Sequence, residues 1–247
     1  MATEVYLIAY TTVHIPWHLQ WEDWPPNPGP VSDAETLTEF AGRMCYRSWA
    51  NPAQRTNAEY IANILQHEHG SVLEHASATF ALLEVSRAFT HELVRHRHLS
   101  FSQESQRFVG PRAISYVIPP LFQGDAEAES RILDHARDTG MDYDYLVQRA
   151  EALLKDQGVS KTARRKRARE AARAVLPNAT PTNLVVTGNH RAWREVLLKR
   201  GSPHADAEMR QVILEIYTQL RAIAPAIYAD IVREVIDGSD VLVRQTS

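Results

Sequence analysis

The chain has 247 residues, of which 44% are hydrophobic and 23% charged, and its net charge at pH 7 is −3. This composition is ordinary for a soluble globular protein with a sizeable core, and the negative charge argues against a general nucleic-acid-binding protein. No apolar run approaches the ~20 residues that span a bilayer, and the amino terminus lacks the features of a signal peptide. Cys45 is the only cysteine, which excludes an internal disulfide and a cysteine-rich zinc cluster. We therefore expect a cytoplasmic protein.

The first part of the chain carries signals for a strand, a loop and a helix. Residues 4–13 are rich in β-branched and aromatic types, which predicts a strand. Residues 17–30 hold three tryptophans and four prolines and are expected to form a loop. Ser32, with Glu35 three residues later, predicts a capping box at the start of a helix that runs toward Cys45.

The next segments are expected to form a helix, a strand and a second helix. Asn57 is expected to cap the first of these helices, whose apolar residues recur at helical spacing. After a short polar link over 71–75, the residues 76–85 predict a strand. Ser86 is then expected to cap a helix that places Arg95 at its carboxyl end.

The second half of the chain is predominantly helical in its pattern. Apolar spacing predicts helices over 126–156, 161–175, 190–200 and 205–223. A short strand over 184–187 and a turn at Gly188–Asn189 are expected before the third of these helices. No internal repeat, low-complexity tract or linker is present, so the sequence predicts one α+β domain over residues 1–247.

The most polar stretch of the chain, residues 95–107, reads RHRHLSFSQESQR. Its arginines, histidines, serines and glutamines must be hydrogen-bonded or charged if they are buried. Arginine forks grip phosphate or carboxylate, and serine and glutamine both donate and accept hydrogen bonds. The stretch therefore predicts a site for a polar, anionic, ring-containing ligand. The alternative is a basic surface loop that contacts nucleic acid.

Six of the eleven histidines lie between His67 and His98, which raises the hypothesis of a metal site. His96 is flanked by Arg95 and Arg97, whose charges disfavour a divalent cation. No HExxH helix or other ligand set of known spacing is present. We therefore predict no metal, with a metal-dependent hydrolase as a competing hypothesis.

Ser105 and Cys45 are the candidate nucleophiles. No GxSxG elbow surrounds Ser105, so a hydrogen-bonding hydroxyl is the better interpretation. Cys45 lies between Arg43 and Arg47, a setting that favours reactivity. A lone cysteine is nevertheless more often a packing residue, and we expect that role for Cys45.

Two further segments carry basic residues. The run from Lys161 to Arg173 is expected to be mostly a solvated helix face. Arg173 is the exception, because it adjoins the apolar end of that helix and is expected to point inward to an anion. In residues 189–194, Asn189 either only caps a helix or stands beside backbone amides that hold a phosphate.

The stretch that begins at Arg95 resembles the signature of the flavin-dependent thymidylate synthases. That signature is RHR, seven intervening residues and a serine, and Ser105 supplies the serine. The fuller pattern RHRxxSxNxxSxR is matched at Arg95, His96, Arg97, Ser100, Ser105 and Arg107. It departs at Ser102, where the family usually has asparagine, and Phe108 replaces a frequent tyrosine. Supporting blocks lie at 67–80, 86–97, 171–180 and 187–205.

The resemblance implies a homotetramer with active sites between subunits, and a fold with a mixed central sheet and long helices. It implies FAD as the cofactor, NADPH as the reductant and 5,10-methylenetetrahydrofolate as the one-carbon donor. The reaction would convert dUMP to dTMP. The anionic, ring-containing ligand expected at residues 95–107 would then be the nucleotide or the flavin.

The resemblance also implies roles for individual residues. Those for dUMP are Glu92, Arg95, Gln103, Ser105, Gln106, Arg107, Arg173 and Arg200. Those for FAD are His69, Ser71, Arg95, His96, Arg97, Gln103, Asn189, Arg191 and Glu195. Arg200 is implied to be catalytic, because its guanidinium would favour ionisation of the uracil at N3 and stabilise the negative charge that develops on the ring.

Glu195 stands where the family commonly has asparagine or histidine, on the face expected to meet FAD. One interpretation is an i,i+4 ion pair with Arg191. The other is a set of hydrogen bonds from a ribose hydroxyl or the adenine amino group. The pair with Arg191 is favoured because its spacing is already present, and it predicts that Glu195→Asn tightens FAD binding.

Overall fold

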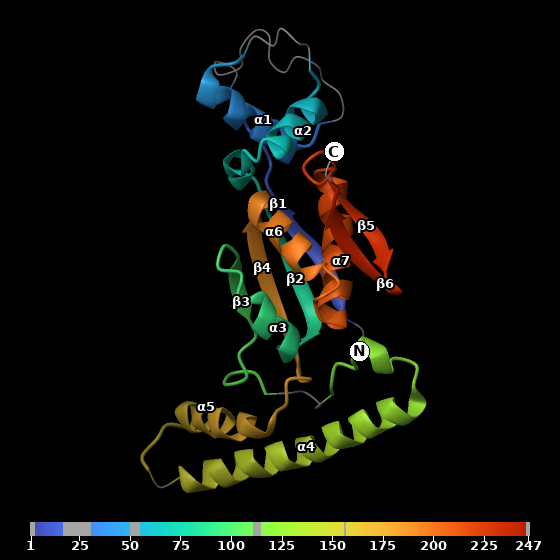
Figure 1. Cartoon of the computed structure of the whole chain (residues 1–247). Coiled ribbons are helices and arrows are strands. Elements are labelled where there is room, and N and C mark those ends of the chain that lie inside the picture. The colour runs from blue at the N-terminus through green and yellow to red at the C-terminus, as the bar shows by residue number, and fades with distance from the viewer. Residues whose placement is uncertain (1–2, 17–30, 50–54, 111–114, 156, 246–247) are drawn as a thin grey trace. The chain divides into compact units, whose positions relative to one another are not determined.

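The computed structural model describes residues 3–16, 31–49, 55–110, 115–155 and 157–245. Its α-helices are α1 (Asp33–Tyr46), α2 (Asn57–Gln66), α3 (Arg87–Leu93), α4 (Ala126–Leu153), α5 (Lys161–Ala172), α6 (His190–Arg200) and α7 (Ala207–Ile223) (Figure 1). Its strands are β1 (Glu4–Tyr10), β2 (Ser77–Ser86), β3 (Ser100–Gln103), β4 (Pro181–Asn189), β5 (Ile231–Ile236) and β6 (Ser239–Arg244). The predicted α+β class is confirmed. The loop expected over 17–30 lies outside the described residues.

The strands form one sheet in the order β1-β2-β4-β3 and a separate two-stranded sheet of β5 and β6. Contacts between residues that are close in space divide the chain into two compact units. Unit 1 consists of Met1–Glu4, Leu82–Arg95 and Ser102–Val185, and unit 2 of Val5–Ala81, His96–Phe101 and Val186–Ser247. The expectation of one domain over residues 1–247 stays a prediction.

The capping box predicted at the start of α1 is confirmed. The Ser32 hydroxyl accepts from the Glu35 backbone N–H at 3.3 Å, and the Glu35 carboxylate accepts from the Ser32 backbone N–H at 3.0 Å. The cap predicted for α2 is wrong by one residue, because Thr56 forms a capping box with Glu59. Asn57 is buried instead, and its amide donates to the carboxylate of Glu39 in α1 at 2.8 Å.

Strand β4 is longer than predicted, and the turn expected at Gly188–Asn189 is wrong. Both residues end the strand, and the Asn189 side chain caps α6 by accepting from the Ala192 N–H at 2.8 Å. A Cβ at position 188 would overlap the side chain of Leu99, so glycine allows the loop that bears Leu99 to approach the end of β4. Helix α6 has the predicted bounds.

The β5–β6 hairpin was not expected from the sequence. Its strands pair antiparallel from Ile231 opposite Arg244 to Ile236 opposite Ser239. Asp237 and Gly238 form the two-residue connection with φ of 49° and 72°. Positive φ at both positions is the requirement of a type I′ turn, and Asp-Gly is a preferred sequence for it.

Helices α6 and α7 carry much of the core of unit 2. Trp193 of α6 is fully buried, and its ring packs edge-on against Phe80 with 5.2 Å between centroids. The Trp193 indole N–H donates to the Ala78 carbonyl at 3.1 Å, which satisfies the buried polar atom. In α7, buried residues recur at the spacing of one helix face: Met209, Val212, Ile213, Ile216 and Leu220.

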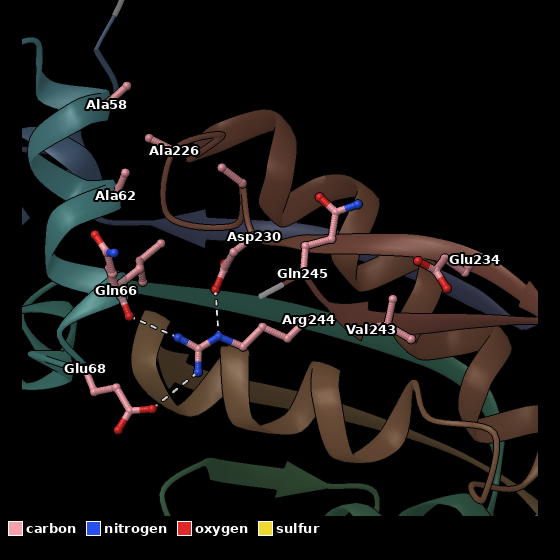
Figure 2. A pocket seen from close by; sticks show the side chains of 12 residues that line it. Ala58, Ala62, Gln66, Glu68, Ala226, Asp230, Glu234, Val243, Arg244 and Gln245 are labelled. Atoms are coloured by element: carbon pink, nitrogen blue, oxygen red, sulfur yellow. Dashed lines mark hydrogen bonds and ion pairs between the residues drawn. The ribbon is translucent and has the colours of Figure 1, made fainter. Parts of the chain in front are cut away.

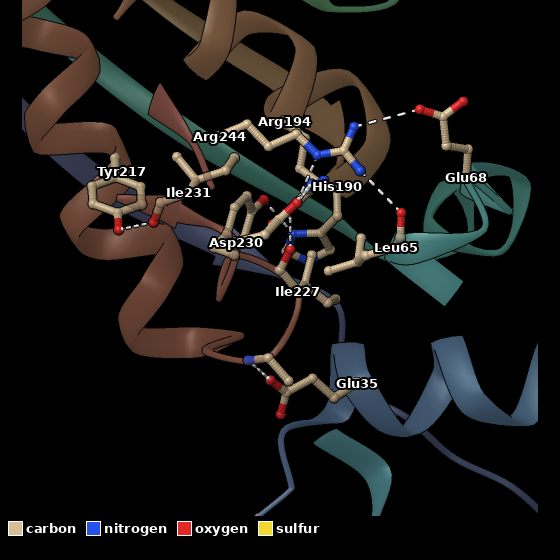
Figure 3. A network of polar contacts seen from close by, with 12 residues as sticks. Glu35, Leu65, Glu68, His190, Arg194, Tyr217, Ile227, Asp230, Ile231 and Arg244 are labelled. Atoms are coloured by element: carbon tan, nitrogen blue, oxygen red, sulfur yellow. Dashed lines mark hydrogen bonds and ion pairs between the residues drawn. The ribbon is translucent and has the colours of Figure 1, made fainter. Parts of the chain in front are cut away.

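A polar network connects α6 to the C-terminal hairpin in unit 2 (Figure 3). Arg194 donates to both carboxylate oxygens of Asp230 at 2.7 Å and to the Ile227 carbonyl at 2.5 Å. Arg244 donates to the same carboxylate at 3.1 Å. Burial works to raise the pKa of Asp230, but the hydrogen bonds from the two arginines outweigh it and leave the pKa below its ordinary value.

His190, the first residue of α6, is buried beside this network. Its Nδ1 lies 2.7 Å from the hydroxyl of Tyr228, and among the described residues its Nε2 has no hydrogen-bond partner. Burial lowers the pKa of His190 to about 4, so the ring is neutral at physiological pH. Burial also raises the pKa of Tyr228.

In unit 1, the long helix α4 packs against α5 (Figure 1). Tyr116 donates to Thr139 of α4 at 2.7 Å, and both side chains are buried. Helix α5 buries only Ala168 and Ala172. The helix predicted over 161–175 ends at Ala172, and a 3-10 turn follows over Arg173–Val175.

No helix among the described residues is long and apolar enough to cross a membrane. Cys45 is exposed near the end of α1, so the expected packing role is wrong for the single chain.

Candidate functional site

The polar stretch starts from helix α3 in unit 1. The Ser86 hydroxyl caps this helix by accepting from the Phe89 N–H at 3.0 Å, as predicted. Thr90, on the next turn, accepts a hydrogen bond at 3.0 Å from the amide of Gln103 in β3. This bond ties Gln103 to the helix whose end carries Glu92 and Arg95. Thr90 lies outside the signature and was not predicted.

The segment after β3 packs on the basic helix α5 in unit 1. Arg107 forms an ion pair with Glu170 at 3.0 Å, and Arg169 donates to the Phe108 carbonyl. The Lys166 ammonium lies 4.8 Å from the centroid of the Phe108 ring, a cation–π contact. The prediction that the basic run is mostly a solvated face is confirmed, because α5 buries only alanines, while Lys166 and Arg169 also contact the segment that follows Ser105.

A half-buried arginine of unit 1, Arg87, lies near Glu104 and Arg173. Arg87 donates to the Glu104 carbonyl at 2.9 Å, and Asn183 donates to the Glu104 carboxylate at 3.0 Å. Burial lowers the pKa of Arg87; Glu104 opposes this effect and the charge of Arg173 adds to it. Arg173 is exposed, so the inward position expected for it is wrong for the single chain.

In unit 2, residues 96–99, here called the RHR loop, are anchored at the start and at the end of α6. Leu99 is buried against Gly188, next to the Asn189 cap. At the other end of α6, the Arg200 Nε–H donates to Nε2 of His96 at 2.9 Å. The loop is thus tied to both ends of the helix that carries two of the predicted cofactor residues, Arg191 and Glu195.

The ion pair expected between Arg191 and Glu195 is wrong. Lys199 donates to Glu195 at 2.6 Å, and Arg191 pairs with Glu74. On a helix, glutamate four residues before lysine is the better orientation, consistent with the helix dipole. The hydrogen bond from Lys199 lowers the pKa of Glu195, and nearby Lys199 and His96 charges add to the effect.

His69 and Ser71 lie at the short 3-10 helix Gly70–Glu74, which contacts α6 in unit 2. Both side chains are exposed. The His69 backbone N–H donates to the Ile64 carbonyl at 3.0 Å. The next residue, Gly70, lies against the guanidinium of Arg191. The polar link predicted over 71–75 is therefore wrong, because most of it belongs to this 3-10 helix, in which Val72 and Leu73 are buried.

The predicted residues separate by unit. All those assigned to dUMP lie in unit 1 except Arg200, and those assigned to FAD lie in unit 2 except Arg95 and Gln103. Glu74, which pairs with Arg191, was missed because no local spacing indicates a partner 117 positions away. Among the described residues, no group of three or more His, Cys, Asp or Glu side chains is arranged to hold a metal ion.

A groove in unit 2 holds none of the predicted residues. It has a volume of about 990 Å³ and is lined by α2 and the C-terminal hairpin. Figure 2 shows Arg244 on its wall between Asp230 and Glu68. The Arg244 guanidinium Nη1 lies 3.6 Å from Oε1 of Glu68. Its small side chains, Ala58 and Ala62 among them, leave the space open.

A family model described as thymidylate synthase complementing protein, Thy1, matches residues 30–226. The flavin-dependent thymidylate synthase of Mycobacterium tuberculosis (strain ATCC 25618 / H37Rv) is 47% identical over 223 residues, which cover 88% of this chain and 89% of that protein. This chain belongs to the flavin-dependent thymidylate synthase family. The family's enzyme from Mycolicibacterium gilvum (strain PYR-GCK) is 45% identical over 240 residues, or 96% of this chain and 93% of that protein.

Solved structures agree with this family fold. Crystal structures of a UMP/dUMP methylase, PolB from Streptomyces cacaoi, bound with 5-Br UMP and 5-Br dUMP, match with TM-scores of 0.59 and 0.60. Each covers 92% of this chain at 20% and 21% identity. At this identity the likeness shows the fold alone.

Proposed function

We propose that this protein converts dUMP to dTMP by reductive methylation, with 5,10-methylenetetrahydrofolate as the one-carbon donor and NADPH as the reductant of bound FAD. Membership in the thymidylate synthase family supports the reaction. The observation that carries the proposal is the arrangement of the signature. Its Gln103 is tied to α3 by Thr90, and its His96 bonds to the predicted catalytic Arg200.

The dUMP phosphate suits the arginines of unit 1. Arg95, Arg107 and Arg173 supply planar donor forks that match a dianionic phosphate. Gln103, Ser105, Gln106 and Glu92 offer the donors and acceptors that a uracil edge and a sugar hydroxyl need. Arg200 would place positive charge beside the uracil where negative charge develops during reaction.

The residues of unit 2 fit a flavin dinucleotide. The amino terminus of α6 favours an anion, and Arg191 and Arg97 present exposed guanidinium groups for a diphosphate. His69, Ser71, His96 and Asn189 add hydrogen-bonding groups, whereas Glu195 pairs with Lys199. Bound FAD would supply the redox chemistry of the reaction.

We further propose that the protein is a homotetramer with active sites between subunits. In the single chain, Arg95, Arg97 and Arg173 are exposed, as expected for cations that a ligand and a neighbouring subunit cover. Light scattering coupled to gel filtration measures the assembly directly. A monomer that is fully active would contradict this part of the proposal.

The reaction is tested with the purified full-length protein. We expect a flavin absorption spectrum and dTMP formation that requires dUMP, 5,10-methylenetetrahydrofolate and NADPH, each omitted in turn as a control. Product is identified by mass spectrometry. A colourless protein that binds oligonucleotides or carries stoichiometric zinc would favour a nucleic-acid-binding protein or a metal-dependent hydrolase instead.

Ser105→Ala is expected to weaken dUMP binding and to slow turnover without abolishing it. Within the described residues the Ser105 hydroxyl has no histidine or carboxylate partner that would make it a nucleophile. Loss of one hydrogen bond to a bound ligand costs ~0.5–1.5 kcal/mol, or about twofold to twelvefold in affinity. Steady-state kinetics with varied dUMP measure the change. A covalent uracil adduct on Ser105, detected by mass spectrometry, would refute the hydrogen-bonding role.

Glu74→Gln is expected to tighten FAD binding, because it removes the carboxylate that pairs with Arg191. The exposed pair competes with a diphosphate by up to about 1 kcal/mol, or roughly fivefold in Kd. Titration of apo-protein with FAD, followed by flavin fluorescence, measures Kd. Glu195→Gln is the matched comparison and should change Kd little, because Glu195 pairs with Lys199. Weaker binding in Glu195→Gln would mean that Glu195 contacts the cofactor.

A further inference from the structure

The end of α6 is hydrogen-bonded to the RHR loop in unit 2. Arg200 is the last residue of α6, and its Nε–H lies 2.9 Å from Nε2 of His96. An arginine guanidinium has only donors, so Nε2 of His96 must be the acceptor. The proton of the neutral imidazole is therefore on Nδ1.

We infer that His96 is a positioning residue, which sets the orientation of the Arg200 guanidinium by accepting this hydrogen bond. The inference rests on the proposed catalytic role of Arg200. A guanidinium is planar and rigid, so a bond at Nε fixes the plane in which the other N–H groups point. Misplacement of a reacting group by about 1 Å costs as much as ~10²-fold in rate.

The surroundings of His96 keep its ring in the accepting form. Burial lowers the pKa of His96, the charges of Arg200 and Lys199 on α6 lower it further, and Glu195 on the same helix opposes them. The charge of His98, in the same loop, lowers the pKa of Glu195. Because the pKa lies below the ordinary 6.5, the neutral ring persists at physiological pH. Protonation at lower pH removes the acceptor and places a second positive charge against Arg200.

Two substitutions separate positioning from simple packing. His96→Gln offers an amide oxygen at about the reach of Nε2, whereas His96→Asn is too short to accept from Arg200. We expect kcat for dTMP formation to be at least tenfold higher in His96→Gln than in His96→Asn, because only the glutamine can accept the hydrogen bond from Arg200. Wild-type kcat should fall in acid as His96 is protonated, and this fall should be absent from His96→Gln. Equal losses in both variants, or an acid limb that persists in His96→Gln, would overturn the inference.

A double-mutant cycle tests whether His96 acts through Arg200. If it does, the double variant His96→Asn/Arg200→Lys should be no slower than Arg200→Lys. If the double variant loses kcat by the product of the two single losses, His96 and Arg200 act independently. FAD affinity is measured in each variant by flavin fluorescence, and kcat is taken at saturating FAD, so that a lost cofactor contact is not mistaken for lost positioning.

A measurement without turnover completes the test. In cofactor-free protein with carbon-13-labelled histidine, the His96 signal is assigned by its loss in His96→Gln and titrated by NMR. Arg200→Gln should move the His96 titration to higher pH, because it removes the adjacent charge. An unchanged titration would overturn the inference. A wild-type protein that forms no dTMP while this titration shift is present would instead refute the proposed function and leave the His96–Arg200 contact in place.

Discussion

Replacement of Arg200 by lysine is expected to lower kcat for dTMP formation by ~10²–10³, the usual effect of losing one preorganised contact to developing charge. Lysine retains the positive charge but lacks the planar fork and the Nε donor that binds His96. Rapid-quench or steady-state assays with saturating substrates measure the loss. The variant should retain FAD and the assembly state of the wild type.

Arg221→Lys is the matched control for this substitution. Arg221 also lies in the last turn of a helix, α7, where it donates to the Tyr217 hydroxyl at 3.1 Å, and no ligand role is assigned to it. We expect wild-type turnover from this variant. Full activity in Arg200→Lys would show that Arg200 does not act in the chemistry.

Asp230→Ala is expected to lower the free energy of unfolding by about 2–4 kcal/mol, because it leaves two arginines without their shared carboxylate. The Arg194 side chain is 10% exposed and that of Asp230 19%, so the desolvated charge of Arg194 would have no carboxylate to balance it. Urea denaturation followed by circular dichroism measures the change. The pKa of Asp230 lies below its ordinary value of 3.8, so the carboxylate is ionised at neutral pH; the wild-type advantage should persist there and be lost as the pH falls through the lowered pKa.

Asp240→Ala in the same hairpin is the control for this loss. Asp240 pairs with Arg233 at 2.7 Å, but both side chains are exposed. Water screens such a pair, so we expect little change in the denaturation midpoint. Equal destabilisation by the two substitutions would mean that the hairpin, and not the buried pair, accounts for the effect at Asp230.

Features of the chain that depend on neighbours in sequence were predicted well. Helix α6 was predicted with its observed bounds, because Asn189 provides the cap and the apolar residues follow one face. The capping box of Ser32 was recognised for the same reason. The resemblance at residues 95–107 indicated the family that the comparisons confirm.

Two local signals were present but overlooked. Thr56 and Glu59 have the spacing of a capping box, one residue before the predicted cap. Asp237-Gly238 has the sequence of a type I′ turn between two apolar runs, which together predict the β5–β6 hairpin. Both features could have been predicted, because the residues that form each of them are close together in the sequence.

Local spacing did not determine which charged side chains pair with one another. Glu195 has Arg191 four residues before it and Lys199 four residues after it, so helical spacing alone permits either pair. Tertiary packing brings Glu74, 117 positions from Arg191, beside that arginine and leaves Glu195 to Lys199. His96 and Arg200 are likewise 104 positions apart. Helix caps and turns could be predicted from neighbouring residues, because local backbone hydrogen bonds link near positions, and the family signature is a contiguous stretch. The ion pairs around α6 needed the folded chain, because Coulomb interactions depend on distance in space.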